Sequence, residues 1–393
     1  MNKGFSRLWL ALVLVASGAA QSVPYTPADD GQVLTRLAAG ATRSQSNPLR
    51  PLQERWRSNP TDVDAAVALA QAQIGLARSE SDPRYLGHAQ ATLAHWWGQR
   101  ELPARVRLLR ATIRQSNHEF GAAIQDLDAV LRENPRDAQA WLTLSTVQLV
   151  IGRIEEARQS CERLRSLTAP LVFVTCAAAA DSMNGLAPSA LAALESAQSR
   201  AAAMPPAVRS WSATVAGEIA ERLGRREDAE RQFRAAVSMD PEDTYARNAL
   251  ADFLLSDGRA DAARQILPRD ALKSDPTLLR IAIALRRTSD PQSGALEESL
   301  FARLAASRER GEALHLREEG RALLELRGDA TQALQLAQRN WQVQKEIADA
   351  RLLLGAAVAT KNAVAARTVL HWTQEHHIED VVLTALGTGM ATK

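Results

Sequence analysis

The residue types in this 393-residue chain that could support redox or metal chemistry are its two cysteines and its seven histidines. Cys161 and Cys176 do not have the spacing of a redox-active C-x-x-C motif, and two cysteines cannot form a zinc-ribbon site. The sequence has no G-x-S-x-G, P-loop, H-E-x-x-H or dinucleotide-binding motif, and nothing in it pairs a nucleophile with a base. We therefore expect no catalytic residue, no cofactor and no enzymatic activity.

One candidate metal site lies near the C-terminus, where His371, Glu375, His376 and Glu379 could share one edge of a helix. Histidines on a protein surface near a chain end are common without any metal. We therefore expect no metal ion here, and we keep metal or small-ligand binding as the alternative function.

The charge balance of the chain argues against a nucleic-acid partner. Lysine and arginine number 47 against 45 aspartates and glutamates, a formal net charge of +2. Two of the positive charges, Lys3 and Arg7, lie in an N-terminal segment that we expect to be removed. The remaining chain is balanced, so no overall positive field would attract nucleic acid or a membrane surface.

Residues 1–20 have the order of a secretory signal peptide. Met1–Arg7 carries two positive charges and no acid, Leu8–Val15 is apolar, and Ala16–Ala20 consists of small residues. This stretch of about 13 apolar or small residues is too short to span a bilayer, which needs roughly 20. We expect cleavage near Ala20, export to the periplasm without membrane insertion of the mature chain, and an irregular arm over residues 21–50.

An internal repeat organises the rest of the chain. A glycine precedes a small residue by the same five positions in several places, and the small residues continue as a ladder with a period of about 34 residues. The glycine–alanine pairs are Gly152/Ala157, Gly185/Ala190, Gly224/Ala229, Gly258/Ala263 and Gly328/Ala333, and the ladder also includes Ala89, Ala123 and Ala366.

Each repeat divides into two helices. Between Asp137 and Arg163, apolar residues recur at helical spacing on both sides of Gly152. Glycine suits the left-handed residue that ends a helix, and a small alanine lets the second helix pack closely against the first. Segments such as Asn134–Asp137 separate the units, because proline cannot continue a helix and aspartate can cap the next one.

These residues resemble the tetratricopeptide repeat (TPR) family, in preference to Sel1-like or HEAT-like repeats. Ala104–Pro135 fits best, Ser210–Pro241 fits closely, and the resemblance extends over about Thr61–His377. It implies an all-α fold, a right-handed superhelical solenoid of about nine helix-turn-helix repeats. In the Pro276–Arg310 stretch the small crossing residue cannot be placed.

The pattern divides the chain into five parts. We expect the signal peptide at residues 1–20, the irregular arm at 21–50, better-matched repeats at 51–273, degenerate repeats at 274–383, and a C-terminal tail at 384–393.

The family's geometry implies that the first helix of each unit lines a concave groove. In the middle units the implied groove positions combine aromatic, amide and acidic side chains, namely Trp211, Glu218, Glu221, Tyr245, Asn248 and Asp252. Aromatic rings supply contact area, and carboxylates would select a basic or hydrogen-bond-donating ligand. The alternative is that these acids only form a solvated helix face. The carboxylate clamp of some TPR domains is absent, because Leu108, Thr112, Thr143 and Ala249 occupy its positions.

The same repeat pattern places Cys161 in the second helix of one unit and Cys176 in the first helix of the next. Two antiparallel helices joined near Thr168 would bring both sulfur atoms to one height, and an oxidising compartment would then favour a disulfide. The alternative is two buried thiols.

The sequence therefore predicts an exported TPR solenoid that acts as a protein–protein interaction module or scaffold of the cell envelope. Its partner would be a protein or peptide of unknown identity, bound on the concave face, with no nucleic acid and no cofactor.

Overall fold

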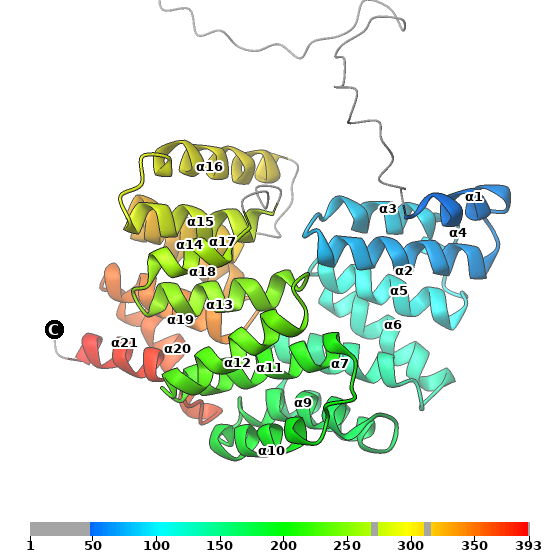
Figure 1. Ribbon diagram of the computed structural model, residues 1–393, viewed down its shortest axis with the longest axis horizontal. Helices are drawn as coiled ribbons and strands as arrows, with labels where there is room; N and C mark the ends of the chain where they lie inside the picture. Colours follow the sequence, from blue (N-terminus) through cyan, green and yellow to red (C-terminus); the bar gives the residue numbers. More distant parts are fainter. Residues whose placement is uncertain (1–47, 269–273, 310–315, 392–393) are drawn as a thin grey trace, which may run out of the picture. The chain divides into compact units, whose positions relative to one another are not determined.

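The computed structural model describes residues 48–268, 274–309 and 316–391. The chain from Leu49 onward forms one compact unit, and its described residues are helical with no β-strand (Figure 1). The expected signal peptide and nearly all of the expected arm lie outside the described residues. Across the described ranges, no helix is both long and apolar enough to cross a membrane.

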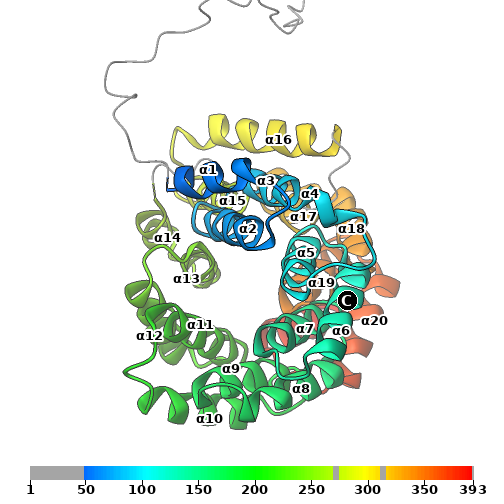
Figure 2. The ribbon, with the colours of Figure 1, turned by 90° about the vertical axis from the view of Figure 1, so that its right-hand side faces the viewer.

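Nine helix pairs make up most of the described part of this unit, which agrees with the number expected from the repeat pattern. In each pair the first helix belongs to an inner row and the second to an outer row (Figure 2). The inner helices are α2 (Val63–Ser79), α5 (Ala104–Ser116), α7 (Ala138–Val150), α9 (Pro170–Asp181), α11 (Pro206–Arg222), α13 (Thr244–Ser256), α15 (Asp275–Arg287), α17 (Leu316–Ala322) and α19 (Ile347–Ala359). The outer helices are α3 (Arg84–Thr92), α6 (Phe120–Glu133), α8 (Ile154–Glu162), α10 (Ala187–Ser199), α12 (Arg226–Met239), α14 (Ala260–Ile266), α16 (Ser293–Glu309), α18 (Ala330–Trp341) and α20 (Ala363–Glu375).

The described residues contain two short helical turns, a 3-10 turn at Arg163–Ser166 and a π-helical turn at Leu323–Arg327, and three further α-helices. These α-helices are α1 (Arg50–Ser58) before the first pair, the short α4 (Ala94–Trp97) after it, and α21 (Val381–Ala391) after the last pair. The prediction of an all-α repeat solenoid is confirmed.

The turn inside each pair has the left-handed backbone that the glycine pattern predicts. All five predicted glycines have φ between 66° and 80°, and every alanine of the ladder is buried. In the other four pairs the left-handed residue of the turn is not glycine; these residues are Ser81, His118, Ser289 and Lys361. His118 and Lys361 have φ of 61° and 54°, and each precedes a ladder alanine, Ala123 or Ala366, by the same five positions.

The poorly matched stretch from Pro276 to Arg310 also forms a helix pair, α15 and α16. Its turn residue is Ser289, with φ of 56°, and α16 begins later after this turn than the other outer helices do after theirs. Glu297 of α16 is buried, and its carboxylate binds Arg286 at 3.2 Å. The late start of α16 departs from the five-residue spacing between turn and small residue in the other units, which explains why no crossing alanine could be placed from the sequence.

Residues 381–391, which include most of the expected C-terminal tail, form helix α21 after the last helix pair. Asp380 stabilises the start of this helix, since its Oδ1 accepts hydrogen bonds from the backbone N–H groups of Val382 and Leu383. Leu383 is buried against the core of the last repeats, so the helix is held by packing as well as by its cap.

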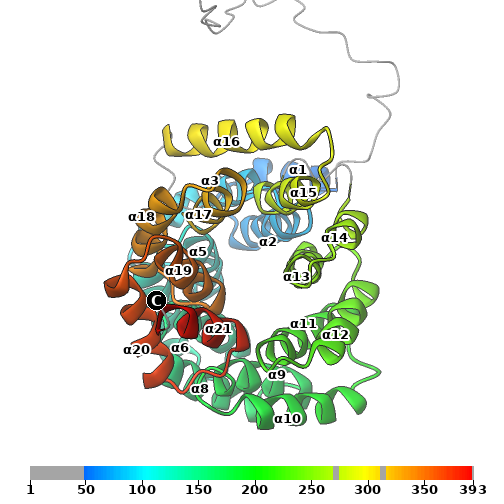
Figure 3. The ribbon, with the colours of Figure 1, turned by 90° about the vertical axis from the view of Figure 1, so that its left-hand side faces the viewer.

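The last repeats pack against the middle ones, far from them in sequence. The turns at Gly152, Gly185 and Gly224 lie against Lys345, His377 and Val381, respectively. The backbone N–H of Lys345 donates to the carbonyl of Val150 at 2.7 Å. The solenoid thus winds far enough for the edge of α19–α21 to lie beside the edge of α7–α12 (Figure 3).

Candidate partner-binding face

The two cysteines form a disulfide bond between α8 and α9, as the sequence predicted. The Cα atoms of Cys161 and Cys176 are 5.5 Å apart, and both side chains are buried. The hydroxyl of Ser145 on α7 lies 3.2 Å from Cys176 Sγ. The bond therefore links two neighbouring repeats directly beneath the inner row.

Five half-buried apolar residues pack around this disulfide; two of them are Ala138 and Trp141 of α7, and the other three come one from each of three successive inner helices. These three are Leu142 on α7, Phe173 on α9 and Trp211 on α11, and we call them the apolar strip. The strip combines the predicted groove residue Trp211 with Leu142 and with Phe173, which the sequence analysis missed. The sequence feature that could have identified Phe173 is an aromatic residue in the first turn of an expected inner helix.

The ion pair of Arg165 and Glu162 lies beside Phe173, at one edge of the strip. The guanidinium of Arg165 lies 4.2 Å from the ring centroid of Phe173, a cation–π distance. Arg165 Nη2 also binds Glu162 Oε2 at 3.0 Å. The arginine therefore already has an acidic partner while it covers one side of the ring.

Tyr245 and Glu218 form the next part of the inner face. Tyr245 on α13 is 66% exposed, and its hydroxyl donates a 2.7 Å hydrogen bond to Glu218 Oε1 on α11. Burial raises the pKa of Glu218 to about 7, although the Tyr245 hydrogen bond and the charge of Arg222 both act to lower it. The Glu218 charge in turn raises the pKa of Tyr245 well above its usual value. Near neutral pH this pair is thus a partly protonated acid bound to a neutral phenol.

Asp252, the predicted acid on α13, forms ion pairs with two arginines of the chain itself. It contacts Arg280 on α15, and its Oδ1 lies 2.6 Å from Arg321 Nη1 on α17. Burial raises the pKa of Asp252, but the two arginines outweigh this effect and hold the pKa below its usual value. The carboxylate is thus ionised and neutralised by these two arginines.

Glu221 and Asn248 are also engaged within the chain. Glu221 Oε1 lies 2.9 Å from Arg351 Nη1 on α19, and the same arginine binds Asp380 at 2.8 Å. Asn248 is buried, and its Oδ1 accepts a hydrogen bond from the Thr277 hydroxyl at 3.2 Å. Of the six predicted groove residues, the structure therefore joins Tyr245 to Glu218 directly, places Trp211 in the apolar strip, and pairs the other three with later repeats.

Comparison with known proteins agrees with this geometry. The family model described as tetratricopeptide repeat matches residues 108–170 and 214–278. The chain is a tetratricopeptide repeat protein. A search of curated proteins finds no match to this TPR protein.

Several solved structures are similar to the TPR protein. TTC0263, a thermophilic TPR protein of Thermus thermophilus, is 25% identical, with 47% of this chain and 100% of that chain covered and a TM-score of 0.40. A tetratricopeptide repeat protein from Parabacteroides merdae is 16% identical, with 64% and 98% covered and a TM-score of 0.38. A monomeric mutant of IFIT1 with Gppp-AAAA is 13% identical, with 83% and 76% covered and a TM-score of 0.47.

The C-terminal histidines of the TPR protein do not form the candidate metal site. In the described part of the chain, no three histidine, cysteine or acidic side chains are grouped so that they could hold a metal ion. The ring of His376 packs against Trp372, with centroids 5.9 Å apart, and Glu379 Oε2 accepts a hydrogen bond from the backbone N–H of Ala187. These groups therefore serve packing and the contact between distant repeats.

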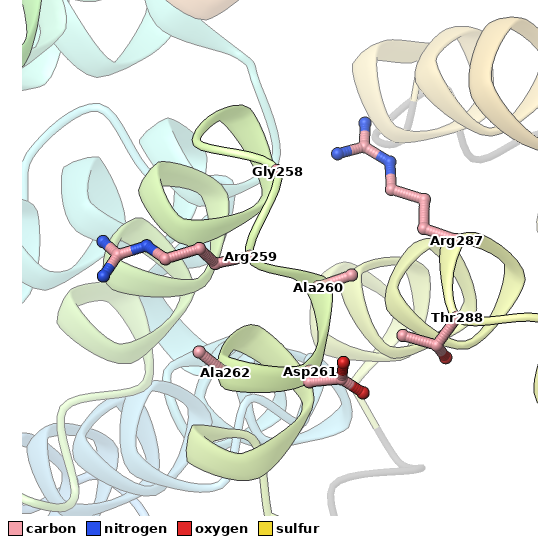
Figure 4. A pocket seen from close by; sticks show the side chains of 7 residues that line it. All are labelled: Gly258, Arg259, Ala260, Asp261, Ala262, Arg287 and Thr288. Carbon is pink, nitrogen blue, oxygen red and sulfur yellow. The ribbon is translucent and has the colours of Figure 1, made fainter.

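A surface hollow lies at the turn of α13–α14 and the end of α15. Gly258, Asp261 and Thr288 are among its lining residues, and the two lining arginines point in different directions (Figure 4). Arg259 binds Glu230, and Arg287 binds Glu325. Both arginines of the hollow are thus engaged in ion pairs within the chain.

Proposed function

We propose that this TPR protein is an exported interaction module of the cell envelope, which holds a segment of a partner protein on the inner face of α7–α13. The TPR fold itself suggests a role in protein–protein interaction or scaffolding. The observation that carries the proposal is Tyr245, a large aromatic side chain that stays 66% exposed on the inner helix α13. Aromatic residues of this kind supply much of the binding energy at protein interfaces.

Export is supported by two independent features of the chain. Residues 1–20 have the charged, apolar and small-residue order of a signal peptide. The Cys161–Cys176 disulfide suits an oxidising compartment such as the periplasm. N-terminal sequencing of the protein purified from a periplasmic fraction tests this part, and a start near Gln21 is expected. An intact Met1 in a cytoplasmic fraction would contradict it.

The partner is tested by mild crosslinking of the mature protein in the envelope fraction, followed by affinity capture and mass spectrometry. We expect one reproducible protein partner that is lost with Tyr245→Ala. Val364→Ala is the matched control, because Val364 is equally exposed, at 66%, but lies on the outer helix α20. A partner retained by Tyr245→Ala would show that binding occurs elsewhere on the molecule.

A further inference from the structure

The inner face of α7–α13 has two chemically different halves. The half on α7, α9 and the start of α11 is the apolar strip of Leu142, Phe173 and Trp211. The half on the end of α11 and on α13 carries the acids Glu221 and Asp252. From the sequence, the acidic half was expected to select a basic or hydrogen-bond-donating ligand, or else to be only a solvated helix face.

The chain itself supplies the basic groups that bind the acidic half. Asp252 is paired with arginines from α15 and α17, and Glu221 is paired with Arg351 from α19. A lysine or arginine of a partner would have to displace a guanidinium that is already desolvated and positioned. Such an exchange gains little free energy, because one ion pair replaces another of the same kind.

Glu218, the third acid of this region, is also unsuited to attract a cation. It is half-buried and accepts the hydrogen bond of the Tyr245 hydroxyl. Its pKa of about 7 means that near neutral pH it carries a full negative charge only part of the time. The inner face between α11 and α13 therefore presents aromatic and hydrogen-bonding surface with little free charge.

The apolar strip contains no charged side chain, and the Arg165 guanidinium stacks on its Phe173 ring. This arginine is paired with Glu162, so this edge of the strip is electrically balanced. The strip crosses three successive inner helices, so a partner that covers it must run along several repeats. An uncharged segment complements this surface, because it leaves no charge desolvated against apolar side chains.

We propose that the partner contributes an extended segment that is uncharged and rich in aliphatic or aromatic residues, and that this segment lies on Leu142, Phe173 and Trp211. This inference rests on the proposed function and adds the chemical class of the partner to it. Affinity then comes from apolar burial over the strip, and the internal ion pairs at Glu221 and Asp252 stay intact.

The test uses the mature full-length protein and three classes of synthetic peptides matched in length: apolar and uncharged, lysine- and arginine-rich, and aspartate- and glutamate-rich. Fluorescence anisotropy gives the affinity of each class at low and at high salt. We expect the uncharged class to bind tightest, with a Kd that changes less than about twofold with salt, because screening weakens only charge–charge attraction.

Variants locate the site of binding. Phe173→Ala should weaken the uncharged peptide by about tenfold, which corresponds to about 1.4 kcal/mol. Leu142→Gln, at a half-exposed position, provides a second variant if Phe173→Ala lowers the melting temperature. Val364→Ala, on the outer helix α20, is the control and should leave the affinity for this peptide unchanged.

Any of three results would overturn the inference. If the basic peptides bind tightest and lose affinity with Asp252→Asn or in high salt, the partner is basic, and the proposed function still stands. If no peptide class binds while crosslinking still captures a partner, an extended segment is not what the face holds. If neither peptide binding nor a captured partner is found, the proposed function fails as well.

Discussion

Arg351 on α19 binds Glu221 on α11, with 2.9 Å between Nη1 and Oε1, although the two residues are 130 positions apart. The same guanidinium binds Asp380, whose side chain has no exposed surface. One arginine therefore connects a middle repeat, the last helix pair and the start of α21. Together with the turn contacts at Gly152, Gly185 and Gly224, it holds the later repeats against the earlier ones.

Removal of this arginine should destabilise the protein strongly. Arg351→Gln leaves the buried Asp380 carboxylate without its cation, a loss on the order of 3 kcal/mol in the free energy of unfolding. Urea unfolding followed by circular dichroism measures the change. Arg165→Gln is the control, because its pair with Glu162 is exposed and should contribute little. Equal effects of the two substitutions would refute the special role of Arg351.

Comparison of Gly185→Ala with Gly258→Ala separates two contributions to the loss of stability. One is the strain of a left-handed backbone at a residue with a Cβ, and the other is the loss of close packing between distant repeats. Both glycines have φ of 75°, so alanine adds similar backbone strain of about 1–2 kcal/mol at each. A Cβ on Gly185 would lie 2.9 Å from His377 Cβ, whereas a Cβ on Gly258 would meet nothing within 4 Å. We expect the larger loss of melting temperature for Gly185→Ala. Identical losses would mean that the contact with His377 adds no stability.

Stability should depend on pH through Glu218. Its pKa is about 7 in the folded protein and about 4.5 when unfolded, so the folded state binds more protons between these values. The stabilising contribution is thus complete below pH 4.5 and is lost as the pH rises through 7. Denaturant midpoints measured from about pH 5 to pH 8 should fall more steeply for the native sequence than for Glu218→Gln. A variant with the same slope as the native protein would contradict this assignment.

The disulfide should stabilise the junction of α8 and α9. Replacement of both cysteines by alanine removes a crosslink that closes a loop of about 15 residues, at a cost of about 3 kcal/mol. Thermal unfolding of the oxidised protein, the protein treated with a reductant, and the double variant gives the comparison. The reductant should lower the melting temperature of the native protein and have no effect on the double variant, which is the internal control.

The helix pairs and their turns were predictable from the sequence because their signals are local. Gly152 and Ala157 belong to one turn and one helix crossing, and their spacing is set by helix geometry alone. The Cys161–Cys176 bond was predictable for the same reason, since it joins two consecutive helices. The pattern failed in one unit, because Ser289 replaces the turn glycine and α16 begins later after its turn than the other outer helices do after theirs.

The environment of the groove acids was not predictable in the same way. Asp252 meets Arg321 and Glu221 meets Arg351 only because many small rotations between repeats add up to bring distant helices together. The accumulated rotation cannot be deduced from the sequence of any one repeat. The sequence therefore indicated which side chains line the inner row, but not that the chain supplies the partners of its own carboxylates.

The contacts of Gly152, Gly185 and Gly224 with later repeats also change how the molecule should respond to force. An array with contacts only between neighbours stretches like a soft spring, because each interface can open slightly without affecting the rest. Here, extension must first separate Lys345, His377 and Val381 from the turns they cover. The solenoid should therefore resist small pulling forces as a stiff body and lengthen abruptly once these contacts give way.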